Sequence, residues 1–169
     1  RIHGTRGTVH YLGFGTQKGN YGATGTLHTT GYLEASDLKL SADGSSEIIA
    51  SATRDGEHRL PMEPESSSLI VRQTRLDPAN GIPAQISIER IGGDNQPQQL
   101  GPTRMDRALR NATRFVTGCA TLFSNWAEGF EKHTNTLPRF DPQVATVAGG
   151  DPNIAYYHSY WKLAPDEAL

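Results

Sequence analysis

The chain has 169 residues, with 16 Lys and Arg against 18 Asp and Glu, so its formal net charge at pH 7 is −2. This balance argues against nucleic-acid binding through phosphate neutralisation, and no apolar run is long enough to cross a bilayer. A lone cysteine, Cys119, can form neither an internal disulfide nor a zinc ligand set, and we expect no cofactor and no metal. The length predicts a single domain over residues 1–169. No export signal opens the sequence, which favours a cytoplasmic location.

Residues 1–92 carry the pattern of an antiparallel β-sheet. β-branched and aromatic residues gather in short runs that glycine or proline separates. The runs with this character are 8–14, 26–33, 68–75 and 84–91. Residues 13–22 are predicted to form a loop or a bulged strand, and Asp43-Gly44 predicts a tight hairpin within residues 36–52.

Residues 93–133 are predicted to form a linker and then one long amphipathic helix over 103–133. Apolar residues recur at alternating intervals of four and three, as expected for a stripe that faces a core. The stripe consists of Met105, Leu109, Ala112, Val116, Cys119, Phe123, Trp126 and Phe130. Gly118 costs about 1 kcal/mol within a helix, which indicates close packing there. The opposite face carries arginines that are either solvated or directed at an acidic partner: Arg107, Arg110 and Arg114.

Residues 134–169 are predicted to be irregular and aromatic-rich. The aromatic residues concentrate at Tyr156, Tyr157, His158, Tyr160 and Trp161. These side chains have apolar bodies and polar tips, so they can line a small-molecule pocket. The alternative is a final strand whose alternate residues pack on the helix.

Signature motifs for catalysis, phosphate binding and metal binding are absent from the sequence. A dinucleotide loop at 13–19 is rejected, because no helix pattern follows it. His10 and His28 can approach each other if their strands pair, but a pair of strand histidines is more often solvent-facing than metal-binding. The catalytic residues, if the chain has any, are therefore left unknown.

Several segments, spread in order over the chain, carry a further signal. They read VHYLGF at 9–14, ADGSSEI at 42–48, SSLIVRQ at 67–73, IERIG at 88–92, GGDPN at 149–153 and LAPDEAL at 163–169. Together they resemble the bacterial family built on domain of unknown function 1214. The resemblance implies an antiparallel jelly-roll-like β-sandwich with the long helix packed on it, and it implies no established reaction. Family members run on past the LAPDEAL segment into further strands, so self-association or a partner chain is expected to complete the sheet.

The resemblance to this family suggests a more specific role for three polar residues. Arg72 and Gln73 lie mid-strand, and Arg90 is expected on the next predicted strand. If they face the interior or the mouth of the sandwich, they can bind a carboxylate in bidentate fashion. If Arg72 faces outward, it is expected to pair across strands with Glu89, and this second arrangement is preferred.

These observations favour a binding module without catalysis, which holds a small apolar or anionic ligand or a partner chain. One alternative is a hydrolase or lyase that acts on a lipid-like substrate, with His10, His28 or His158 as general base. A buried histidine flanked by a carboxylate in a closed pocket would favour that enzyme. The other alternative is an oligomerisation subunit, which a large uncovered apolar surface would favour.

Overall fold

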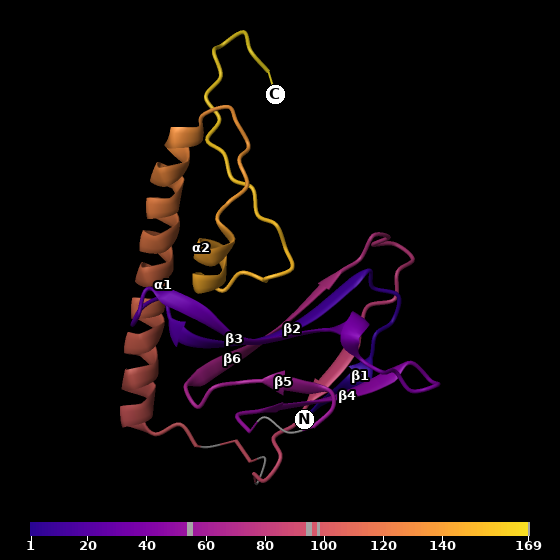
Figure 1. The fold of residues 1–169 in the computed structure, drawn as a ribbon. Coiled ribbons are helices and arrows are strands. Elements are labelled where there is room, and N and C mark those ends of the chain that lie inside the picture. The colour runs from indigo at the N-terminus through magenta and orange to yellow at the C-terminus, as the bar shows by residue number, and fades with distance from the viewer. Residues whose placement is uncertain (54–55, 94–95, 98, 169) are drawn as a thin grey trace. The chain divides into compact units, whose positions relative to one another are not determined.

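The computed structural model describes residues 1–53, 56–93, 96–97 and 99–168 and has a mainly-β fold with one long helix (Figure 1). The strands are β1 (Ile2–Thr5), β2 (Tyr11–Asn20), β3 (Thr26–Glu34), β4 (Ser45–Ser51), β5 (Arg59–Pro61), β6 (Ser66–Thr74) and β7 (Gln85–Ile88). The helices are α1 (Pro102–Phe130) and α2 (Pro142–Val147), with short 3-10 turns η1 (Ala35–Asp37) and η2 (Glu131–His133).

The strands form two sheets that share one hydrophobic core. The strand order is β5-β4-β1-β7 in the four-stranded sheet and β3-β2-β6 in the three-stranded sheet. β1 pairs antiparallel with β4 and β7, and β2 pairs antiparallel with β6, while β4 and β5 run parallel. The core residues are Ile2, Val9, Leu12, Phe14, Ala35, Leu38, Ile48 and Leu60. Because they come from both sheets, they confirm the predicted β-sandwich.

The described residues fall into two compact units. The first comprises Arg1–Lys18 and Thr29–Gln99, and it contains the core of the sandwich. The second comprises Gly19–His28, which is the tip of the β2–β3 hairpin, together with the chain from Leu100 onward. Whether the two units behave as the single expected domain stays a prediction.

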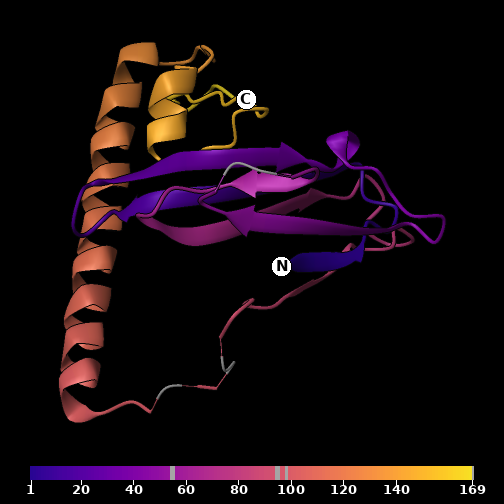
Figure 2. The same cartoon turned by 60° about the horizontal axis from the view of Figure 1, so that its bottom comes forward.

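α1 confirms the predicted long helix, since it begins one residue early and continues through η2 to His133. Proline at its start is favourable, because the first N–H groups of a helix have no partner within it. The prediction that the stripe faces a core is wrong for the first half, where Leu109 is 60% and Val116 is 67% exposed. α2 lies beside the second half of α1 in both views (Figure 1, Figure 2). Although α1 is long, no described helix is apolar enough to cross a membrane.

The hairpin tip packs closely on α1 within the second unit. A Cβ atom at Gly118 would lie 2.3 Å from the carbonyl oxygen of Tyr21, and one at Gly22 would lie 2.4 Å from that of Arg114. Both separations are far inside van der Waals contact, so the two backbones meet where each lacks a side chain. The Tyr21 ring also contacts Phe115, with ring centroids 5.7 Å apart. Close packing at Gly118 is therefore confirmed.

The predicted hairpin at Asp43-Gly44 is confirmed only in its turn and its second arm. Gly44 has φ +77°, and β4 follows, but residues 38–41 are not a strand. The Asp43 carboxylate accepts hydrogen bonds from the backbone N–H and the hydroxyl of Ser45, at 3.0 and 2.7 Å. These local bonds hold the turn without a paired first arm.

Other short elements differ from the prediction. β2 extends through residues 13–20, so this segment is a strand rather than a loop, and the bulge in its pairing with β6 lies on β6. β5 was not predicted, and it ends on Pro61 at an edge of its sheet. Proline is tolerated at an edge because its missing N–H removes no hydrogen bond between strands there. In place of a final strand, Tyr157 and Tyr160 form isolated bridges. α2 was also not predicted, and it begins where the Asp141 side chain accepts from the N–H of Gln143 at 2.8 Å.

Candidate functional site

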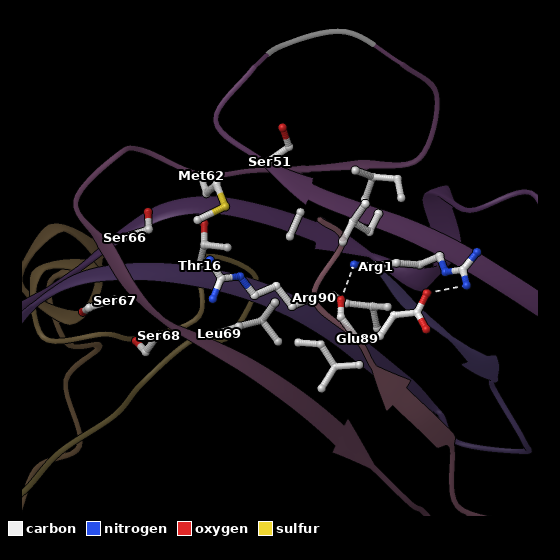
Figure 3. Close-up of a pocket in the computed structure, with 15 residues that line it drawn as sticks. Arg1, Thr16, Ser51, Met62, Ser66, Ser67, Ser68, Leu69, Glu89 and Arg90 are labelled. Carbon is white, nitrogen blue, oxygen red and sulfur yellow. Dashed lines mark hydrogen bonds and ion pairs between the residues drawn. The ribbon is translucent and has the colours of Figure 1, made fainter. Parts of the chain in front are cut away.

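A cavity of about 580 Å³ lies between the two sheets, and we call it the inter-sheet cavity (Figure 3). One wall comes from β1, from β4 and from the end of β7 with the residues that follow it. The other wall comes from β2, from the start of β6 and from the segment before it. The lining residues are Arg1, Ile2, Thr16, Ile49, Ala50, Ser51, Met62, Ser66, Ser67, Ser68, Leu69, Ile88, Glu89, Arg90 and Ile91. All of them belong to the first compact unit.

A chain of hydroxyl groups fixes the back of this cavity. Thr16 is 2% exposed, and its hydroxyl donates to the carbonyl oxygen of Pro61 at 2.6 Å. The Thr30 hydroxyl donates to Thr16 at 3.0 Å, and it lies 2.7 Å from the Ser66 hydroxyl. Since Thr30 has one proton and gives it to Thr16, Ser66 donates to Thr30. The chain of bonds ties three strands and the β5 end together, so this wall is rigid.

A bulge in β6 aims Ser66 into that network. Gln17 pairs with Ser68 and Lys18 pairs with Ser66, so Ser67 is the extra residue. One added residue reverses the alternation of faces beyond it. Without the bulge, Ser66 would share a face with Ser68 and would lie on the opposite face of the sheet from Thr16.

The charges around the cavity are unevenly paired. The Arg1 guanidinium forms ion pairs with Glu47, at 3.3 Å, and with Glu89. Glu89 is therefore neutralised at the rim. Among the described residues, no hydrogen bond or ion pair engages the Arg90 guanidinium, which reaches across the cavity toward Thr16 (Figure 3). Within the part of the chain that the structure describes, the cavity thus presents one positive charge without an ion-paired carboxylate.

Of the three polar residues expected to act together, Arg90 alone lines this cavity. Arg72 lies opposite Gly13 in the β2–β6 register, whereas the neighbouring positions Leu12 and Phe14 are in the core. Because faces alternate along a strand, Arg72 lies on the outer face of its sheet. The Gln73 side-chain oxygen accepts the N–H of Ala84 at 3.0 Å, so it connects two segments of the sandwich.

The expected pairing of Arg72 with Glu89 is wrong. Their segments belong to different sheets, because β6 pairs with β2 and β7 pairs with β1. Glu89 instead contacts Arg1. Arg90 also follows β7 rather than lying on it, since that strand ends at Ile88.

A second cavity, of about 420 Å³, lies in the second unit and is named here the aromatic cavity. Its lining residues are Asn125, Trp126, Gly129, Phe130, His133, Pro138, Arg139, Phe140, Asp141, Val144 and His158. The His158 ring stacks on Phe130 at 4.7 Å with 7° between the planes, and it meets Phe140 edge-on at 4.7 Å. Trp126 lies 5.2 Å from Phe140 and 6.1 Å from His158 between ring centroids.

Two of the five predicted aromatic pocket residues line cavities. His158 lines the aromatic cavity and an adjoining cavity of about 290 Å³, which Tyr156 also lines. The Tyr156 hydroxyl accepts the N–H of the buried Asp151 at 2.9 Å. The remaining three lie outside both cavities and are 52%, 39% and 48% exposed: Tyr157, Tyr160 and Trp161. As binding residues, all five stay a prediction.

The histidines proposed as general bases lack the expected setting. His158 is surrounded by aromatic rings, and the carboxylate nearest in the lining, Asp141, caps α2. His10 and His28 are exposed. Across the described residues, no group of three or more His, Cys, Asp or Glu side chains is arranged to hold a metal ion.

The sequence interpretation missed most of the residues that shape both cavities. Thr16 and Ser66 gave no signal, because their role depends on a bulge and on pairing between strands distant in sequence. Trp126 and Phe130 were assigned to a core-facing stripe, and their aromatic character at the helix end was the signal that was overlooked. Phe140 lies in a segment expected to be irregular.

The chain is 45% identical to an uncharacterised protein from Burkholderia cenocepacia whose crystal structure is known. The two structures agree with a TM-score of 0.91 over 98% of this chain. The match covers 46% of the solved chain, so this chain spans about half the length of that protein. No protein-family model matches the sequence, and no curated protein matches it. The likeness establishes homology to a bacterial protein and brings no function with it.

Proposed function

We propose that this protein is a non-catalytic binding module that holds a small anionic molecule with an apolar body in the inter-sheet cavity. The observation that carries the proposal is Arg90, whose guanidinium lines the cavity without a described partner. A guanidinium offers two parallel N–H donors to a carboxylate, and such charge-assisted bonds are about twice as strong as neutral ones. A carboxylate is therefore the group that best fits the free end of Arg90.

The rest of the cavity supports an apolar body on that ligand. Its volume of about 580 Å³ falls within the range of small-molecule sites. Aliphatic side chains supply most of the contact surface around the arginine: Ile2, Ala50, Met62, Leu69 and Ile91. The exposed Ser68 adds a second polar group, since its hydroxyl makes only a long contact of 3.4 Å with the Gln17 amide oxygen.

We also propose that the chain belongs to the bacterial family built on domain of unknown function 1214. Two of the segments that carry the resemblance supply cavity walls, namely SSLIVRQ at 67–73 and IERIG at 88–92. Together they contribute Ser67, Ser68 and Leu69 on one side and Ile88 to Ile91 on the other. A shared cavity gives these separate segments a common physical role.

Calorimetric titration with octanoate tests the proposal, with octanamide as the uncharged analogue. Arg90→Gln is expected to weaken octanoate binding by about tenfold or more, since a hydrogen bond to a charged group contributes about 1.5–3 kcal/mol. Octanamide is expected to bind both proteins equally. Arg107→Gln is the matched control, because Arg107 is an exposed arginine of α1 outside the cavity. Octanoate binding that survives Arg90→Gln unchanged would overturn the proposal.

A second candidate function is association with another chain, and the exposed apolar stripe of α1 favours it. Met105, Leu109 and Val116 are 42%, 60% and 67% exposed, and they lie in one row along the helix. Native mass spectrometry separates the two candidates. Discrete multiples of the chain mass support association, whereas a monomer carrying an added small mass supports ligand binding.

A further inference from the structure

We propose that the aromatic cavity is a second binding site, specific for a planar aromatic carboxylate. The site is separate from the inter-sheet cavity, and every residue of its lining belongs to the second compact unit. The proposal therefore stands whether or not the inter-sheet cavity binds a ligand.

The walls favour a flat ring. Trp126, Phe130, Phe140 and His158 contact one another through ring faces and edges, with centroids 4.7 to 6.2 Å apart. Aromatic rings attract one another in offset-stacked and edge-on arrangements, which contribute beyond the burial of apolar surface. A planar ligand can continue this arrangement, whereas a saturated ring presents hydrogens on both faces and cannot stack.

A glycine adjoins the space for that ring. Gly129 lies in the last turn of α1 and lines the cavity, and a Cβ placed on it would have no heavy atom within 4 Å. At this position the helix surface is open, so a large side chain here would fill the cavity rather than strain the helix. The volume of about 420 Å³ suits a molecule with one or two rings.

The polar groups around the cavity favour an anion. Arg139 is one of the residues that line the cavity, and no hydrogen bond or ion pair among the described residues engages its guanidinium. Its backbone is fixed by an antiparallel bridge to Tyr157. The one carboxylate in the lining, Asp141, is engaged by the N–H of Gln143 at the start of α2. Asp141 keeps its negative charge there, so the group that attracts an anion is Arg139, whose guanidinium can donate two parallel N–H bonds to a ligand carboxylate.

Calorimetric titration with 2-naphthoate tests the site, with 2-naphthamide and cyclohexanecarboxylate as analogues that lack the charge and the planarity. We expect 2-naphthoate to bind about tenfold more tightly than either analogue. Gly129→Leu is expected to weaken binding by about tenfold or more, while Ala127→Leu, at an exposed position of α1 outside the lining, leaves it unchanged. Arg139→Gln is expected to reduce 2-naphthoate binding to the level of 2-naphthamide.

The location of the bound probe is read independently from fluorescence. The sequence has two tryptophans, and Trp161→Phe leaves Trp126 as the reporter within the cavity. We expect 2-naphthoate to quench Trp126 in this variant with the same affinity that calorimetry gives. Arg90→Gln is expected to leave both measurements unchanged, which distinguishes this site from the inter-sheet cavity. The proposal is overturned if a folded Gly129→Leu variant binds 2-naphthoate as the unmodified protein does, or if Trp126 does not respond.

Discussion

Two glycines of α1 provide a test in which the same substitution has opposite effects. In an isolated helix, replacing an interior glycine by alanine stabilises by roughly 0.5–1 kcal/mol. Gly129 meets this expectation, because its added Cβ has no neighbour within 4 Å. Gly129→Ala is therefore expected to raise the free energy of unfolding by about 0.5–1 kcal/mol.

Gly118 is expected to respond in the opposite direction. Its added Cβ would lie 2.3 Å from the carbonyl oxygen of Tyr21 and 2.7 Å from the backbone nitrogen of Gly22. Ordinary contact begins near 3.4 Å, so the hairpin tip would have to retreat by about 1 Å from the helix. Overpacking of this kind costs about 1–3 kcal/mol, which exceeds the gain in helix propensity. Gly118→Ala is therefore expected to destabilise by about 1–2 kcal/mol.

Urea unfolding followed by far-ultraviolet circular dichroism measures both effects, because α1 dominates the helical signal. The difference between the two variants, about 2 kcal/mol from the values above, lies well outside the error of such measurements. A shift of both variants in the same direction would refute the reasoning, because propensity alone would then govern both sites. The contact between the hairpin tip and α1 would in that case be absent in solution.

Three further predictions concern the core, the hairpin tip and one turn. Leu60→Ala is expected to cost about 2–5 kcal/mol, because Leu60 is 0% exposed, and a loss under 1 kcal/mol in urea unfolding would contradict this. Tyr21→Phe removes a 2.6 Å hydrogen bond to the Ala148 carbonyl oxygen and is expected to cost about 1 kcal/mol by the same assay. Hydrogen bonds from Ser45 lower the pKa of Asp43, so its ionised form stabilises the turn above its unfolded pKa and loses that effect as pH falls through the folded pKa. A carboxyl NMR titration of Asp43 is expected to show a midpoint below the usual value of about 3.9, and a higher midpoint would contradict it.

The sequence predicted the elements whose signal is local. The spacing of the stripe from Met105 to Phe130 identified α1, and the run 84–91 indicated a strand, of which β7 covers residues 85–88. Elements too short to show a period were missed, such as β5 with three residues and α2 with six. Their existence depends on a sheet edge and on a capping side chain, and neither leaves a periodic pattern.

The candidate sites were predicted less well, because they depend on register and on distant partners. Arg72 was expected near Arg90, but one step of register along β6 decides which face a side chain occupies. Arg90 lines the cavity because it follows β7, where alternation no longer applies. His158 finds its ring partners at Trp126, Phe130 and Phe140, and no pattern within residues 156–161 reveals those distances.

The second compact unit is built from two separate stretches of chain, so its parts are synthesised at different times. Residues 19–28 leave the ribosome well before the helix that contacts them, which begins at Pro102. The hydrogen-bond partner of the Tyr21 hydroxyl, the carbonyl oxygen of Ala148, is synthesised only after a further 127 residues. At translation speeds of about 5–20 residues per second, the tip remains uncovered for about 6–25 s. The sandwich can begin to assemble during that interval, whereas the second unit forms only after Ala148 has been synthesised, so exposed aromatic surface at the tip makes this period the one most open to chaperone capture.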